Sequence, residues 1–328
     1  MNIIAADVGG TKTRLIFADA DEPGKVLFEA RYASGEFDGF EPLLDTFIHD
    51  SGSTVSQVES LTLALPGLVT DSSARLTNLP WVIEKQGLKD AYGIKTVSFM
   101  NDFQASALGT GQLQKKDQLV LNTGISKDGD LNDNATRVAV GAGTGLGVAW
   151  AQDDEGVAHA YDSEGGHIDF APVDDTQIRL LQFLQKRHDH VSYERILSGD
   201  GLVSLYEFCA GEQGNEVQRD QITAKWVNDQ SPDNAMADKA MILFVQIYGS
   251  YIGNIAMLFK PYGGIFITGG IAAKMVERMQ SEEFINAYLN KGRMRTLVEQ
   301  IAVYLVTDER IGVLGAMSEA VKTQRVKK

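Results

Sequence analysis

The pattern of apolar and polar residues along the chain predicts alternating strands and helices. Short runs of apolar and β-branched residues predict strands, whereas apolar residues spaced three and four positions apart predict helices. Strand patterns lie at residues 2–8, 15–19, 25–34, 60–65, 95–99, 118–124, 137–152 (on both sides of a glycine-rich turn), 262–268 and 301–308. Helix patterns lie at residues 39–52, 86–93, 103–109, 176–188, 201–208, 233–259, 281–292 and 312–323. We therefore expect an α/β fold in which mixed sheets are flanked by helices.

Other segments are predicted to connect these elements. A short hairpin is expected within residues 66–81, and residues 111–135 and 212–234 are predicted to be polar, loop-rich connections. A further helix is expected directly after Gly269-Gly270, where a helix N-terminus could bind an anion.

Two glycine turns share one design. An apolar strand runs into Gly9-Gly10-Thr11 and a second strand leaves it, and the same occurs around the GAGTGLG run at residues 141–147. Each turn could be only a glycine hairpin. Each could also bring backbone N–H groups close to phosphate oxygens, because glycine lacks a Cβ. Their recurrence after about 130 residues indicates an internal duplication.

Two aspartates end predicted strands. Asp102 lies between a strand and a helix, at the carboxyl edge of a sheet, where α/β folds bind ligands. It could instead only cap the helix formed by residues 103–109. Asp7 ends the first strand and could hold a hydrated Mg²⁺ ion.

Further polar side chains gather around a second glycine pair. Glu164 and His167 flank Gly165-Gly166, and a carboxylate beside an imidazole can hydrogen bond vicinal hydroxyl groups. They could also be two ordinary surface residues, and a metal site is disfavoured because no third ligand lies nearby in the sequence. Glu194 could be a solvent-facing helix residue, and Ser198 is expected to cap the helix that follows it.

Composition narrows the function classes. The chain has 328 residues, enough for about two domains, with 44% hydrophobic residues, 23% charged residues and a net charge of −14. Such a surface disfavours nucleic acid and anionic membranes as partners. The single cysteine, Cys209, lies in an apolar helix pattern and is expected to be a buried, unreactive thiol. The N-terminus does not resemble a signal peptide, and no apolar run resembles a membrane span, so a soluble cytoplasmic protein is expected.

Eight motifs together resemble a known family. DVGGTKTR, ALPG, LTNLPW, MNDFQA, VGAGTGLGVA, SEGGHIDFAP, SYERILSGDGL and FITGGI occur in this order between Ala6 and about Ala316. Each motif is moderately specific, but the ordered set resembles the bacterial glucokinases of the non-ROK kind, within the hexokinase–actin–chaperone ATPase superfamily. The ROK relatives carry a cysteine-rich zinc loop, which one cysteine cannot supply.

The resemblance implies a fold and a reaction. The fold would be two duplicated, ribonuclease-H-like α/β domains with a cleft between them, a small one (residues 1–111 plus 309–328) and a large one (residues 112–308). The reaction would be ATP-dependent phosphorylation of D-glucose to glucose 6-phosphate, the first step of glycolysis, with Mg²⁺ as cofactor. A homodimer is also implied, with glucose and ATP as the small-molecule partners.

The resemblance also assigns residues. Asp102 would be the general base, and the sugar would be bound by Asn78, Asn101, Asp102, Glu164, His167 and Glu194. ATP would be bound by Ala6, Asp7, Val8, Gly9, Gly10, Thr11, Lys12, Gly143, Thr144, Gly145, Gly269 and Gly270, and Asp7 would hold Mg²⁺ through water. Two residues depart from the family pattern: Lys12 stands where asparagine is common, and Ser163 stands where glycine is usual.

Three other functions fit parts of the pattern. A kinase for mannose, fructose or glucosamine would use the same motifs. A sugar-binding regulator without catalysis would need a helix-turn-helix before the first strand, which begins at about residue 2. An actin-type or chaperone-type ATPase would give no reason for the EGGH run.

Overall fold

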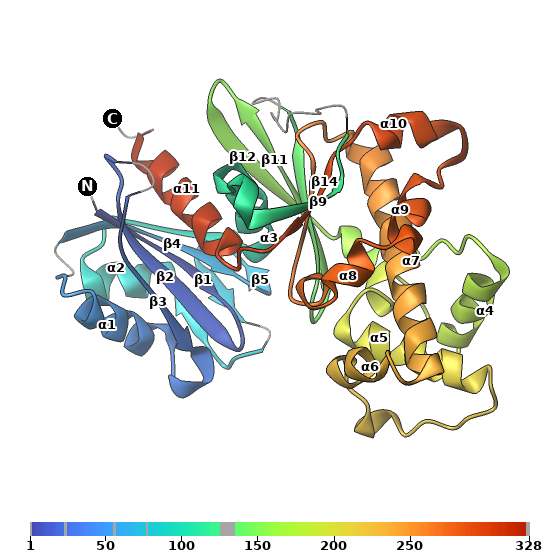
Figure 1. The fold of residues 1–328 in the computed structure, drawn as a ribbon. Coiled ribbons are helices and arrows are strands. Elements are labelled where there is room, and N and C mark those ends of the chain that lie inside the picture. Colours follow the sequence, from blue (N-terminus) through green and yellow to red (C-terminus); the bar gives the residue numbers. More distant parts are fainter. Residues whose placement is uncertain (1, 23–24, 55–56, 77, 125–134, 326–328) are drawn as a thin grey trace. The chain divides into compact units, whose positions relative to one another are not determined.

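The computed structural model describes residues 2–22, 25–54, 57–76, 78–124 and 135–325 (Figure 1). The chain divides into two compact units. Unit 1 comprises Met1–Gln114, Ala149–Asp162 and Asp308–Lys328, and unit 2 comprises Lys115–Val148 and Ser163–Thr307. This division differs from the predicted domains by grouping Ala149–Asp162 with unit 1, and the domain boundaries given above stay a prediction.

Unit 1 is built on a mixed sheet with the strand order β3-β2-β1-β4-β8. Its strands are β1 (Asn2–Val8), β2 (Lys12–Asp19), β3 (Val26–Ala33), β4 (Val58–Leu65) and β8 (Thr96–Asn101). β1 pairs antiparallel with β2 and parallel with β4, which pairs parallel with β8. The register places Asp7 opposite Ala64 and Leu65 opposite Asn101, so the ends of β1 and β8 lie at the same edge of the sheet.

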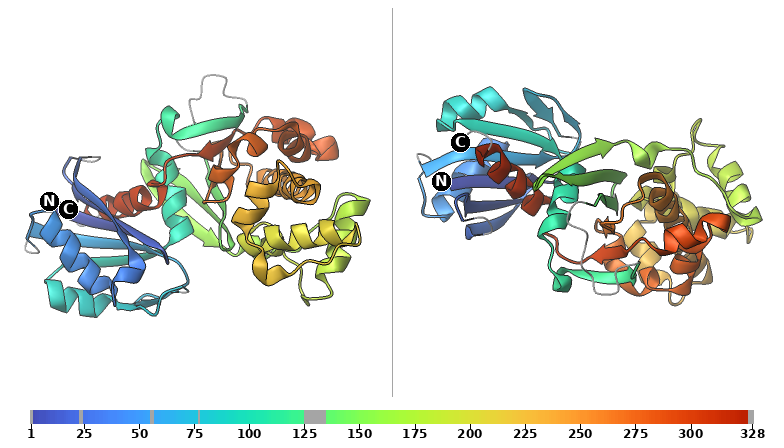
Figure 2. Two further views of the ribbon diagram at one scale, coloured as in Figure 1. Left: turned by 60° about the horizontal axis from the view of Figure 1, so that its bottom comes forward. Right: turned by 90° about the horizontal axis from the view of Figure 1, so that it is seen from above.

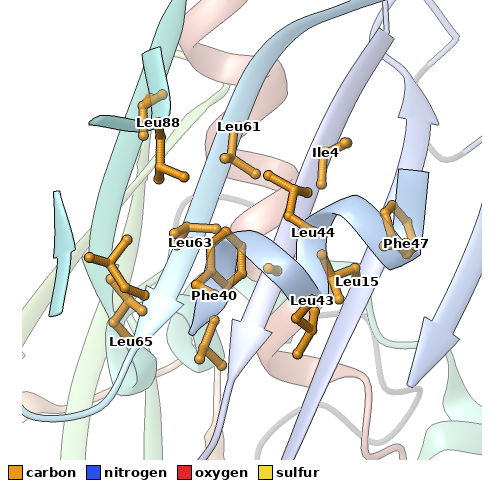
Figure 3. Close-up of a cluster of buried hydrophobic side chains, with 14 of the residues drawn as sticks. Ile4, Leu15, Phe40, Leu43, Leu44, Phe47, Leu61, Leu63, Leu65 and Leu88 are labelled. Carbon is orange, nitrogen blue, oxygen red and sulfur yellow. The ribbon is translucent and has the colours of Figure 1, made fainter. Parts of the chain in front are cut away.

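One face of this sheet is covered by α1 (Phe40–Asp50), as Figure 3 shows. Alternate residues of a strand point to the same face, and Ile4, Ala6 and Val8 of β1 lie in one buried cluster with Leu15 and Phe17 of β2. The cluster also contains Phe40, Leu43, Leu44 and Phe47 of α1 and Leu61, Leu63 and Leu65 of β4. Burial of these side chains is the main source of stability for this face.

The helices α11 (Ile311–Arg325) and α3 (Asp102–Gly109) pack against each other, and α11 also contacts β1 and β4. The two helices approach at backbone distance, because a Cβ on Gly109 would overlap the Ile311 carbonyl and one on Gly315 would overlap the Ala105 carbonyl. The short helix that begins at Asp102 is therefore held against a long helix of the same unit.

The remaining elements of unit 1 are short. A small antiparallel sheet has the order β5-β6-β7, formed by β5 (Leu68–Val69), β6 (Ser73–Arg75) and β7 (Val82–Glu84). The helix α2 (Lys85–Tyr92) ends at Gly93, whose φ of 65° gives the left-handed cap that glycine favours. The 3-10 helices are η1 (Ser34–Glu36) and η3 (Thr110–Gln112).

The second sheet has the order β12-β11-β10-β13-β14-β9. Its strands are β9 (Gln118–Asn122), β10 (Arg137–Ala142), β11 (Leu146–Asp154), β12 (Val157–Ser163), β13 (Ile265–Thr268) and β14 (Val303–Val306). β13 runs parallel to β10 and β14, and β9 adds an antiparallel edge. The order β12-β11-β10-β13-β14 repeats the order β3-β2-β1-β4-β8, which confirms the predicted duplication.

The helices of unit 2 surround α7 (Ala235–Phe259), which contacts α5, α6 and α9 (Figure 2). The others are α4 (Asp175–Leu184), α5 (Gly199–Gly211), α6 (Ala224–Gln230), α8 (Val276–Met279), α9 (Glu282–Leu289) and α10 (Arg295–Glu299). The 3-10 helices are η4 (Lys115–Asp117), η5 (Gly165–His167), η6 (Tyr193–Arg195), η7 (Arg219–Gln221), η8 (Ala272–Lys274) and η9 (Gly292–Met294). By length and mean hydropathy α7 could cross a membrane, contrary to the expectation from the sequence, but 67% of its most apolar window is buried inside the structure. Burial of this extent is typical of a helix in the core of a folded domain.

Several local predictions are confirmed and others are wrong. Ser198 caps α5 by accepting the Gly201 N–H at 3.1 Å, and Cys209 is buried, which raises the pKa of its thiol to about 11.

The prediction of a helix directly after Gly269-Gly270 is wrong, because a 3-10 turn and the one-turn α8 follow instead. β12 was not predicted, because its sequence VAHAYDS has few large apolar residues and, as in an edge strand, none of them is fully buried. The expected connection at residues 111–135 contains β9, and its residues 125–134 lie outside the described ranges.

The core under α1 yields a stability prediction. Leu63→Ala should lower the free energy of unfolding by about 2–5 kcal/mol, because it removes a fully buried side chain and leaves a cavity. Val82→Ala in the same unit is the matched control, since Val82 is 50% exposed and should change the unfolding midpoint little. Urea denaturation of the two variants and the parent checks this. Equal midpoints for both variants would contradict the assignment of Leu63 to the core.

Candidate functional site

The turn between β1 and β2 is closed by hydrogen bonds. Gly9 N–H donates to the Lys12 carbonyl at 3.0 Å, and the buried Ser34 hydroxyl donates to the Gly9 carbonyl at 2.7 Å. A Cβ on Gly10 would lie only 2.7 Å from the Cβ of Asn78. Packing alone therefore requires glycine at position 10, and the structure brings the predicted site residue Asn78 against this turn.

Lys12, which departs from the family pattern, forms an ion pair with Glu309 in the structure. Lys12 Nζ lies 2.6 Å from Glu309 Oε2, and the two side chains are 50% and 60% exposed. Arg14 and Arg31 also approach the Glu309 carboxylate, at 3.8 Å and 3.4 Å. An exposed ion pair of this kind contributes at most about 1 kcal/mol, so Lys12 can exchange Glu309 for an anionic ligand at little cost.

Asp7 lies at the end of β1, against the first turn of α11. A Cβ on Gly312 would overlap Asp7 Oδ2, so only a glycine leaves room for this carboxylate. Burial and, to a smaller extent, the charge of Asp102 raise the pKa of Asp7 to about 6, while Arg14 and Lys12 act in the opposite direction. The two carboxylates therefore repel each other electrostatically at one edge of the sheet.

The start of α3 is capped by Asn101. Asn101 Oδ1 accepts the N–H groups of Phe103 at 2.8 Å and Gln104 at 3.3 Å, and Gln104 Oε1 accepts the Asn101 N–H at 3.1 Å. These bonds form a capping box. The interpretation that Asp102 only caps this helix is therefore wrong. Since its oxygen is engaged, Asn101 would meet a ligand with its amide Nδ2.

Asp102 is the first helical residue of α3. Its Oδ1 accepts the Phe103 N–H at 3.0 Å. Burial raises the pKa of Asp102 to about 6, and the hydrogen bond from the Phe103 backbone acts against this rise. A carboxyl group with this pKa is ionised at neutral pH and is a stronger proton acceptor than an ordinary aspartate.

In unit 2, Glu194 lies against the glycine turn between β10 and β11. Glu194 Oε2 accepts the Leu146 N–H at 2.9 Å, and a Cβ on Gly145 would lie 2.5 Å from the same oxygen. The side chain of Glu194 is 27% exposed. The alternative of a solvent-facing helix residue is therefore wrong: Glu194 lies in the short η6 and reaches across to another segment.

Glu164 and His167 lie beside Glu194. His167 Nε2 is 3.7 Å from Glu164 Oε2 and 3.7 Å from Glu194 Oε1, and Glu164 and His167 are 90% and 55% exposed. The departure at Ser163 stabilises this turn, because its hydroxyl donates to the Val148 carbonyl at 2.9 Å and accepts the Gly165 N–H at 3.2 Å. Two carboxylates and an imidazole thus form one partly open polar group, which can hydrogen bond several hydroxyls of one ligand.

The other predicted glycines of unit 2 lie at the ends of β10 and β13. Gly143 N–H donates to the Gly145 carbonyl at 2.8 Å, and the Gly143 carbonyl accepts the Gly199 N–H at 2.9 Å. A Cβ on Gly143 would meet no atom within 4 Å. Gly269 has a φ of 88°, and a Cβ there would lie 2.5 Å from the Ala142 carbonyl. The structure therefore brings Gly269 to the glycine turn, and Thr144 within that turn is exposed.

A magnesium ion would have few protein ligands in this chain. Among the described residues, no group of three or more histidine, cysteine, aspartate or glutamate side chains could hold a metal ion. Mg²⁺ commonly keeps several waters and takes one or two carboxylates together with substrate phosphates. Asp7 fits that role, because a cation near it would offset the repulsion between the Asp7 and Asp102 carboxylates.

Three contributors were not predicted from the sequence. Ser34 fixes the β1–β2 turn, Gln104 completes the capping box, and Gly312 makes room for Asp7. The spacing of Asn101 and Gln104 is a capping-box signal that could have been found. Ser34 and Gly312 carry no local signal, because they act on residues far away in the chain.

Comparison with known proteins shows the family of the chain. A family model described as Glucokinase matches residues 4–323. The glucokinase of Hahella chejuensis is 33% identical over 98% of this chain and 98% of its own length, and that of a Nostoc species is 31% identical over 96% and 97%. The crystal structure of a glucokinase from an Antarctic psychrotroph is 27% identical, has a TM-score of 0.85, and covers 98% of this chain and 99% of its own.

The order of the motifs, the duplicated sheets and these matches over nearly the full length agree with one another. The chain belongs to the glucokinase family.

Proposed function

We propose that Asp102 is the general base in the ATP-dependent phosphorylation of D-glucose to glucose 6-phosphate, the reaction that membership of the glucokinase family gives this chain. The observation that carries the proposal is a partly buried carboxyl group with a pKa of about 6, held at the start of α3 next to a second carboxyl group. Its neighbour Asn101 caps the helix and fixes the position of Asp102.

The chemistry requires such a group. A sugar hydroxyl is a weak nucleophile, so a base that accepts its proton as the new P–O bond forms accelerates the reaction by roughly 10²–10⁴. The proton of the 6-hydroxyl would pass to a carboxylate oxygen of Asp102. The rest of the barrier is lowered mainly by positioning and by neutralisation of phosphate charge.

The polar group of unit 2 supports the choice of a sugar. Glu164 and Glu194 each place a carboxylate oxygen 3.7 Å from Nε2 of His167. Two carboxylates and an imidazole so close together can hydrogen bond several neighbouring hydroxyls of one sugar. A sugar that lacked one of these hydroxyls would leave one of these side chains without its hydrogen-bond partner, which is a basis for selectivity. We propose that these residues, with Asn101 and Asn78, bind glucose.

The glycine turns are proposed to bind ATP. The segment from Ala6 to Lys12 and the segment from Gly143 to Gly145 would hold its phosphates, and Gly269-Gly270 would lie near its adenosine. Because the Gly143 N–H is engaged within its own turn, Thr144 and Gly145 are the more suitable backbone donors there. Asp7 would hold Mg²⁺ through water, and the ion would supply neutralisation of phosphate charge.

The setting of the enzyme follows from the same family membership. We propose a cytoplasmic homodimer with no nucleic-acid or membrane partner. The acidic surface, with a net charge of −14, supports the last two points. We also propose that the small and large domains are bounded as the sequence motifs imply.

Asp102→Asn tests the assigned base. Turnover should fall by about 10²–10⁴ because the amide cannot accept the proton. Folding should be retained: burial raises the pKa of Asp102 from 3.8 to about 6, so the ionised carboxylate destabilises the folded chain above that pH. The melting temperature of the variant at pH 7.5 should therefore equal or exceed that of the parent. Turnover within tenfold of the parent would remove Asp102 from this role.

The parent enzyme should also lose activity in acid. Asp102 must be ionised to accept a proton, so kcat/KM for glucose should fall about tenfold per pH unit below about pH 6. The measurement is ADP release at saturating ATP over pH 4.5–8.

The same assay with mannose, fructose and glucosamine at pH 7.5 identifies the preferred sugar, and equal kcat/KM for another hexose would assign that sugar as the substrate.

The two glycines of the β10–β11 turn should respond differently to a methyl group. Gly145→Ala displaces Glu194 and should raise KM for glucose by about tenfold, since one charged hydrogen bond is worth roughly 1.5–3 kcal/mol. Gly143→Ala meets no atom within 4 Å and should leave KM for glucose unchanged while raising KM for ATP. Steady-state kinetics with each substrate varied in turn measures both effects. A glucose effect of equal size in the two variants would contradict the role given to Glu194.

A further inference from the structure

Lys291 is a lysine with neutral partners. Its ammonium donates to Ser250 Oγ at 3.1 Å and to Asn254 Oδ1 at 2.9 Å, both on α7. Within the described residues, no carboxylate oxygen forms an ion pair with it. Burial lowers the pKa of Lys291 to about 8, so holding the charge here costs free energy.

The backbone of α7 is adapted to this side chain. A Cβ on Gly253 would overlap Lys291 Cε and lie 2.5 Å from the Tyr288 carbonyl. The glycine therefore allows the lysine stem to lie across α7 and reach Ser250 and Asn254. A solvated surface lysine would need no such accommodation.

The contact with Lys291 fixes the orientation of the Asn254 amide. An ammonium only donates hydrogen bonds, so Asn254 must turn its Oδ1 toward Lys291 and its Nδ2 away from it. Nδ2 then donates to the hydroxyl oxygen of Tyr193 at 3.0 Å. Without Lys291, the Asn254 side chain loses the ammonium that anchors it, and its contact with Tyr193 is no longer held in place.

Tyr193 directly precedes Glu194 and is itself fully buried, with 1% exposure. Its ring packs on Tyr251 with a centroid separation of 4.6 Å, and the Tyr251 hydroxyl donates to the Gly165 carbonyl at 2.8 Å. Gly165 lies in η5 between Glu164 and His167. The same part of α7 therefore holds both short segments that carry the polar group of unit 2.

We infer that Lys291 and Asn254 are positioning residues for glucose: they hold Tyr193, and through it Glu194, in the geometry that binds the sugar. The inference rests on the proposed role of Glu194 in sugar binding. Neither residue touches the sugar, so removing the lysine charge should weaken glucose binding without a comparable change in ATP affinity.

A double-mutant cycle tests this connection by calorimetric measurement of glucose binding. Lys291→Met keeps the length of the stem without the charge, and Tyr193→Phe removes only the hydroxyl. Each should weaken glucose binding about tenfold, and the double variant should also lose about tenfold rather than a hundredfold, because both changes break one pathway. Lys239→Met, an exposed lysine on α7, is the matched control and should bind glucose like the parent.

A rescue variant separates positioning from general destabilisation. Asn254→Asp still offers Lys291 an acceptor and lets Tyr193 donate its own hydroxyl, so glucose binding should stay within threefold of the parent. If Lys291→Met does not fold, Tyr193→Phe alone must still weaken glucose binding and leave ATP binding within twofold. Parent-like binding by Tyr193→Phe, or multiplying losses in the double variant, would overturn the inference. If the parent itself binds no glucose, the proposed function fails instead.

Discussion

Two carboxylates of this protein lie where only a glycine leaves room for them. Asp7 occupies the space of a missing side chain at Gly312 in the first turn of α11, and Glu194 occupies the corresponding space at Gly145. In each case the acid comes from one segment and the glycine from another that is distant in the chain. The positions of these charged groups therefore depend on close backbone approach, which in turn depends on packing of the helices and sheets around them. A tightly packed framework of this kind holds a polar site at fixed geometry with few hydrogen bonds.

The same framework places carboxylates where burial disfavours their charge. Asp7 and Asp102 both have raised pKa values near 6. Asp7 lies against the backbone at Gly312, and Asp102 accepts the Phe103 N–H. At neutral pH both are ionised at some cost in stability, a cost that decreases as the pH falls from about 6 toward 4. Stability alone would favour neutral side chains at these positions. Their presence is understandable if a ligand with a hydroxyl proton and a counter-cation uses them.

The sequence predicted most of the framework, because it is specified by local patterns. The apolar runs of β1 and β2, the helical spacing of α1 and the duplicated glycine hairpins can all be read within short windows. Contacts between distant segments could not be predicted from the sequence, because they have no local signature. They are the contact of Gly312 with Asp7, the hydrogen bond of Ser34 to Gly9, and the hydrogen bonds that join Lys291, Asn254 and Tyr193. The error at Gly269-Gly270 had a different cause. Glycines after a strand indicated a helix start, but Gly269 is used instead for its left-handed φ and its close approach to Ala142. At Asp102 the alternative of a helix cap is wrong, because Asn101, one residue earlier, caps α3.

The structural and the functional interpretation of the glycine turns are compatible. Gly10 and Gly145 each have a packing reason to be glycine, since a Cβ would collide with Asn78 or with Glu194. Their presence therefore says little about phosphate. Gly143 is different: a Cβ there would meet nothing within 4 Å among the described residues, and its two backbone hydrogen bonds, to Gly145 and from Gly199, do not require a glycine. Because no contact among the described residues requires a glycine at this position, a ligand that needs close access to the backbone is the best physical reason for it. The phosphate hypothesis thus rests most directly on Gly143.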